Sequence, residues 1–128
     1  MAVTHPVAFR NLVANLLGDS VDSGKLVFRV TGSTADSPGT AVATLTLNAA
    51  AFGAASSGVA TAGAIPSDTN AAGGVIAFAT IQTSADVIKA HCSVAAVSGG
   101  DINISSGGLT VTAGDTVSCS SLTYTAPV

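Results

Sequence analysis

The period of the hydrophobic pattern changes at Gly24. Before that residue, large apolar side chains recur at three- and four-residue intervals over residues 9–17, which is the period of an amphipathic helix. After it, Leu26, Phe28 and Val30 alternate with their neighbours, which is the period of a β-strand. The chain therefore predicts one N-terminal helix followed by β structure.

The predicted helix and a short arm before it occupy residues 1–24. Pro6 suits the start of the helix, because its missing N–H costs nothing there. The apolar stripe consists of Phe9, Leu12, Val13, Leu16 and Leu17, and the other side carries Arg10, Asn11 and Asn15. Two interpretations are open: the stripe covers one end of the β domain as part of its core, or it docks in a groove of a partner.

Six to eight short strands are predicted over residues 25–128, separated by turns rich in Gly, Asp and Ser. The expected strands are residues 26–31, 42–47, 59–65, 75–83, 87–97, 102–104, 109–112 and 116–124, with a further turn at 105–108. The first two read as an antiparallel hairpin, and residues 48–70 are the least regular part. Because no βαβ unit is present, we expect a single-domain antiparallel β-sandwich or barrel preceded by one α-helix.

The composition argues against several classes of function. The chain has 128 residues, with no Glu or Trp, four basic residues and seven Asp. A net charge of −3 disfavours binding to nucleic acid, which needs clustered Lys and Arg, and to anionic membrane surfaces. No secretory signal is visible, so synthesis in the cytoplasm is expected. Since so few reactive groups are present, we expect a protein that is not an enzyme and that acts through its shape and surface.

The candidates for chemistry are weak. His91 lacks the G-x-S-x-G elbow of a serine hydrolase and is interpreted as a solvated side chain on the polar face of its strand. Asp101 and Asp115 lack the spacing of a calcium loop, and Asp in turns hydrogen-bonds its own backbone. Cys92 and Cys119 match no zinc pattern and are expected to be reduced thiols, with a disulfide as the alternative. We therefore predict no catalytic residue, no metal and no cofactor.

The order of short motifs along nearly the whole chain provides a further clue. The motifs are FRNLVAN at 9–15, GKLVFR at 24–29, ATLTL at 43–47, FGAASSGVA at 52–60, SGGDINI at 98–104, AGDTV at 113–117 and LTYT at 122–125. In this order they resemble a family of small virion proteins of tailed bacteriophages, found among the head genes, some of which are capsid decoration (cement) proteins.

This resemblance implies a structural protein that binds the outside of an icosahedral capsid in many copies and stabilises it. Its partners would be the major capsid protein and itself, as a dimer or trimer, and it would reside in the virion. The residues expected to contact the capsid are Val3, His5, Phe9, Arg10, Leu12 and Leu16. The alternatives are a carbohydrate-binding or host-attachment module on a tail or fibre, disfavoured by the scarcity of aromatic residues, and a hydrolase that uses His91.

Overall fold

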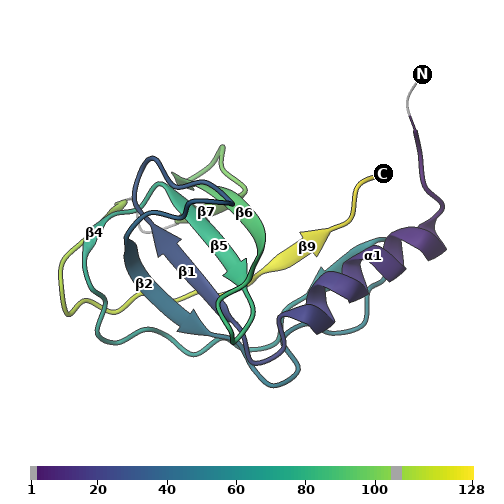
Figure 1. The fold of residues 1–128 in the computed structure, drawn as a ribbon, viewed down its shortest axis with the longest axis horizontal. Coiled ribbons are helices and arrows are strands. Elements are labelled where there is room, and N and C mark those ends of the chain that lie inside the picture. Colours follow the sequence, from purple (N-terminus) through teal and green to yellow (C-terminus); the bar gives the residue numbers. More distant parts are fainter. Residues whose placement is uncertain (1–2, 105–107) are drawn as a thin grey trace.

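The computed structural model describes residues 3–104 and 108–128, and it shows a mainly β domain with one helix at the N-terminal end (Figure 1). The predicted fold class is therefore confirmed. Of the turn expected at 105–108, only Gly108 is among the described residues.

Helix α1 (Val7–Ser20) begins one residue after Pro6, whose backbone is extended. The Ser20 hydroxyl donates a hydrogen bond to the Leu17 carbonyl at 2.7 Å in the last turn. Gly18 lies inside the helix, which continues to Ser20. The chain then turns into the β domain at Gly24, whose N–H donates to the Val21 carbonyl at 2.8 Å.

Five strands form the main sheet, in the order β2-β1-β5-β6-β7. They are β1 (Lys25–Arg29), β2 (Ala41–Thr46), β5 (Phe78–Gln82), β6 (Ile88–Ala96) and β7 (Ile102–Ile104). The predicted hairpin is confirmed, because β1 and β2 are antiparallel with Leu26 opposite Leu45. The strand expected at 87–97 corresponds to β6.

The pairing of β6 with β7 differs from the prediction, because these two strands are parallel. Val97 and Gly99 both have positive φ angles, 69° and 97°, which reverse the chain over a few residues. The N–H of Val97 donates to the carbonyl of Ile104 at 3.0 Å, so the returning segment lies against the end of β6. A tight connection with two positive φ angles, which brings β7 back beside β6 in the same direction, thus replaces the expected hairpin.

Two small sheets complete the β structure. β3 (Val59–Thr61) pairs with β9 (Thr123–Thr125), and β4 (Gly74–Val75) pairs with β8 (Thr110–Val111). The strand expected at 75–83 is divided into β4 and β5. Ile76 donates its N–H to Leu109, whereas Ala77 donates to Arg29, so the chain changes partners at this point.

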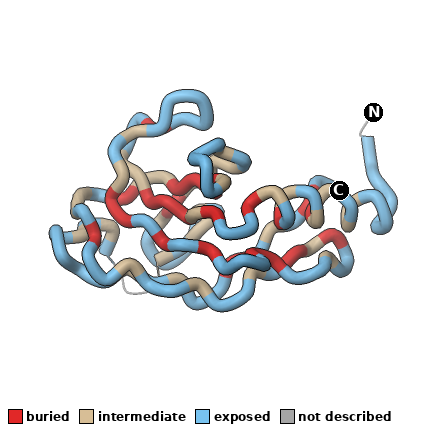
Figure 2. The backbone as a smooth tube through the Cα atoms, turned by 60° about the horizontal axis from the view of Figure 1, so that its bottom comes forward, coloured by how far each residue is buried: buried red, intermediate tan, exposed pale blue. Residues whose placement is uncertain are grey.

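One hydrophobic cluster joins the main sheet to both small sheets. Leu26, Leu45 and Ile76 are among its fully buried side chains. Buried residues concentrate along the strands, and the loops around them are mostly exposed (Figure 2). The strand expected at 116–124 is mostly absent: β9 accounts for its end, and Val117 makes only an isolated bridge to Asp68.

Candidate docking surface on the N-terminal helix

The side of α1 that faces the β domain carries small residues. Ala14 and Gly18 are the buried residues of the helix, which packs against β3. A Cβ atom at Gly18 would lie 2.9 Å from Cβ of Phe52, closer than real contacts allow. The absence of a side chain at Gly18 therefore lets the helix approach the domain closely.

Polar side chains on the same side hold the helix in place. Asn11 Oδ1 accepts a hydrogen bond from the backbone N–H of Gly58, and Asn15 Oδ1 accepts one from that of Ala55, both at 2.8 Å. The Arg10 guanidinium lies over Gly58 and donates to the Ala126 carbonyl at 3.5 Å. The side opposite the apolar stripe is thus the side that attaches the helix, because it supplies acceptors for loop N–H groups.

The opposite side of α1 exposes large apolar side chains. The exposed fractions are 47% for Phe9, 65% for Leu12 and 72% for Leu16, and 76% for Val3 in the arm before the helix. We call these four residues the helix face. Isolated exposed apolar residues are ordinary, but several gathered along one arm and helix are typical of an interaction surface.

The structure brings most of the predicted contact residues together. Val3, Phe9, Leu12 and Leu16 belong to the helix face, and the exposed His5 ring lies against Phe9 with 4.9 Å between ring centroids. Arg10 lies elsewhere, against Gly58. Val7 is 52% exposed, but the helical spacing places it on the side of α1 that carries Asn11 and Ala14. Val13 and Leu17 of that stripe are half-buried at its border.

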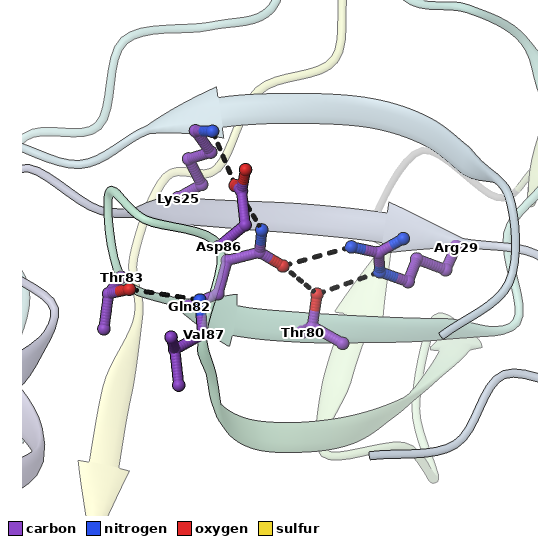
Figure 3. A network of polar contacts seen from close by, with 7 residues as sticks. All are labelled: Lys25, Arg29, Thr80, Gln82, Thr83, Asp86 and Val87. Carbon is purple, nitrogen blue, oxygen red and sulfur yellow. Dashed lines mark hydrogen bonds and ion pairs between the residues drawn. The ribbon is translucent and has the colours of Figure 1, made fainter. Parts of the chain in front are cut away.

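A second polar group lies on the main sheet, around Arg29 (Figure 3). The Arg29 guanidinium donates from Nε to Thr80 Oγ1 at 3.0 Å, from Nη1 to the Gly39 carbonyl at 2.8 Å and from Nη2 to Gln82 Oε1 at 3.1 Å. Thr80 and Gln82 are buried, and Thr80 also donates to Gln82 at 2.8 Å. Arg29 therefore satisfies buried oxygen atoms on β5 and ties β1 to the loop before β2.

The same network continues to the turn after β5. Asp86 Oδ1 accepts hydrogen bonds from Lys25 Nζ at 2.6 Å and from Gln82 Nε2 at 2.9 Å. The hydrogen bond from Lys25 is the main reason that the pKa of Asp86 is lowered from its ordinary value. These groups bond to one another across three segments, so the network ties β1, β5 and the turn after β5 together.

The predicted candidates for chemistry do not converge. His91 is half-buried against Phe78, with 4.9 Å between ring centroids, so it differs from the solvated residue expected. Its Nε2 atom has no hydrogen-bond partner among the described residues. Cys92 and Cys119 are free thiols, and burial raises the pKa of both. Within residues 3–104 and 108–128, no three His, Cys or Asp side chains gather as metal ligands would.

Comparisons of the chain with protein-family models, with curated proteins and with solved structures find no match. In the part of the chain that the structure describes, no helix has the length and hydropathy needed to cross a membrane. Arguments about function therefore rest on the helix face and on the order of motifs along the sequence.

Proposed function

We propose that this chain is a structural virion protein of a tailed bacteriophage, a decoration protein that docks its helix face on the outer surface of the capsid. The observation that carries the proposal is the orientation of α1. The helix is attached through Asn11, Ala14 and Asn15, and the side chains of the helix face are exposed away from these residues. The resemblance in motif order supports the choice of a capsid as the partner.

The energetics suit a protein that binds in many copies. Burial of apolar surface contributes about 25 cal/mol per Å², so a short helix and arm provide a modest affinity for one site. Contacts between neighbouring copies, as in a dimer or trimer, add avidity without new contacts to the capsid. The small net charge of −3 leaves little repulsion between copies at close range. Bound copies would oppose expansion of the shell by bridging its subunits.

Replacing both Phe9 and Leu16 with serine tests the proposal. Each side chain contributes about 1.5–3 kcal/mol when fully buried, so we expect binding to purified capsids to weaken about 100-fold or more. The melting temperature of the free protein should stay nearly unchanged, because both side chains are exposed in it. Bound copies per capsid, measured over a range of protein concentrations, give the affinity.

The matched control is Val75→Ser with Val87→Ser, which removes two exposed apolar side chains of the β domain. This double variant should bind capsids as the parent protein does. The proposal is wrong if the Phe9 and Leu16 substitutions leave capsid binding intact. It is also wrong if they unfold the free protein, since the stripe would then belong to the core.

A further inference from the structure

A cavity of about 660 Å³ lies in the β domain. Asp101 and the strand β7 line one side of it, and residues 115–123 line another. Its lining also includes the apolar side chains of Phe28, Ile76 and Leu122, which are buried members of the core. We call this cavity the slot.

The pattern of lining residues indicates which parts of the two segments border the slot. Side chains of an extended segment alternate between two faces, so a cavity above one face is lined by every second residue. Here residues 101–104 line the slot consecutively, and so do residues 115–123. Consecutive lining residues indicate that the backbone of these two segments borders the slot as well as their side chains.

Both segments have backbone groups to offer. β7 is the last strand of its sheet, so only one of its edges is paired, with β6. Among the described residues, residues 118–121 make no backbone–backbone hydrogen bond, although Val117 and Leu122 on either side do. An edge with unpaired backbone groups is a template for an added strand.

The charge of the slot indicates the chemistry of an added strand. Asp101 and Asp115 line it, and no Lys or Arg does. Each carboxylate uses Oδ2 for local bonds, to Ser93 in one case and to the N–H of Thr112 in the other. The basic residues of this chain lie in α1, β1 and β6, so its own arm carries none to offer a second copy.

We propose that the slot accepts an extended segment of another protein that carries a Lys or Arg side chain. The segment forms an additional strand between β7 and residues 118–121, by the β-augmentation mode of peptide recognition. Small apolar side chains of the segment rest on the half-buried Ile102, Ile104 and Val117, which also line the slot. The cation of the segment pairs with Asp101 or Asp115. This site is separate from the helix face and does not depend on capsid binding.

Two synthetic peptides of eight residues provide the probe. Both alternate Val and Thr, and they differ only in one central residue, Lys or Asp. We expect the Lys peptide to bind the full-length protein about tenfold more tightly than the Asp peptide, as measured by fluorescence anisotropy. In a Cys92→Ser background, the Lys peptide should also slow maleimide labelling of Cys119, which lines the slot.

Filling the slot gives the decisive comparison. Gly108 lines it, its φ is outside the left-handed region, and a Cβ atom there would meet open space. Gly108→Tyr should therefore fold and abolish binding of the Lys peptide while leaving every charge in place. The control Gly53→Tyr, where a Cβ atom meets only the Thr61 carbonyl at 3.7 Å, lies outside the slot and should bind normally.

The proposal is overturned if Gly108→Tyr binds the Lys peptide as the parent does, or if both peptides bind equally or not at all. Should Gly108→Tyr fail to fold, the double variant Asp101→Asn and Asp115→Asn decides the question. It must remove the preference for Lys over Asp, and a preserved preference contradicts the proposal. Loss of peptide binding with intact capsid binding would confirm that the two sites are distinct.

Discussion

Replacing Gly24 with alanine is expected to lower the free energy of unfolding by about 3 kcal/mol or more. Gly24 is buried where the chain passes from α1 into the β domain. A Cβ atom there would overlap the Gln82 carbonyl oxygen and would lie 2.7 Å from that of Val21. Both contacts are with backbone, which cannot rotate away as a side chain can. The Gly24 carbonyl also accepts a hydrogen bond from the Leu47 N–H, so a shift would disturb three segments at once.

Thermal unfolding followed by circular dichroism measures this effect. For a domain of this size, the loss corresponds to a fall in melting temperature of about 10 °C or more. Gly53→Ala is the matched control, because its nearest contact is at an ordinary 3.7 Å. Equal melting temperatures for the two variants would show that the chain does not pass as closely to Gln82 as the structure describes.

Replacing both Asn11 and Asn15 with alanine should cost about 2–4 kcal/mol of unfolding free energy. The two substitutions leave the N–H groups of Gly58 and Ala55 without their acceptors. Alanine is the better helix former, so the intrinsic preference for helix would rise while the stability of the protein falls. If helix preference rises while the free energy of unfolding falls, the loss comes from the attachment of the helix to the domain and not from weaker helix formation.

Urea unfolding of the double variant measures the loss. The comparison variant is Leu12→Ser, on the exposed side of the same helix, for which we expect a change of about 0.5 kcal/mol. A larger loss for Leu12→Ser than for the double variant would mean that the apolar side faces the domain. The helix would then be packed as its hydrophobic pattern alone suggests.

The sequence predicted the positions of the helix and the strands better than it predicted which strands pair and in which direction. The change of period at Gly24 located the helix and the first strands, and the alternation around Leu26, Phe28 and Leu45 identified core side chains. These are local signals of spacing. The parallel arrangement of β6 and β7 depends on positive φ angles at Val97 and Gly99, and a valine gives no signal of such an angle.

The direction in which α1 faces could not be predicted, because it depends on residues distant in the sequence. Asn11 and Asn15 look like surface residues until the loop N–H groups of Gly58 and Ala55 lie beside them. The need for glycine at position 18 is evident only once Phe52 packs where a side chain would lie. Of the predicted contact residues, Val3, Phe9, Leu12 and Leu16 belong to the helix face, whereas Arg10 lies against Gly58.

Sequence patterns also did not predict the slot. The alternation at 116–124 predicted a strand, yet Ser118, Ser120 and Ser121 lie in a segment that pairs with no other described residue through its backbone. Whether an extended segment joins a sheet depends on a partner edge at the right distance, and the pattern within the segment does not report that.

Docking of the helix face on the capsid is tested most directly by the accessibility of position 16 in the free and the capsid-bound protein. A Leu16→Cys variant, with Cys92 and Cys119 replaced by serine, is labelled with a maleimide in both states. If the helix face docks on the capsid, we expect rapid labelling of the free protein, where Leu16 is 72% exposed, and strong protection of this position on the capsid. Slow labelling of the free protein, or equal labelling in both states, would contradict it.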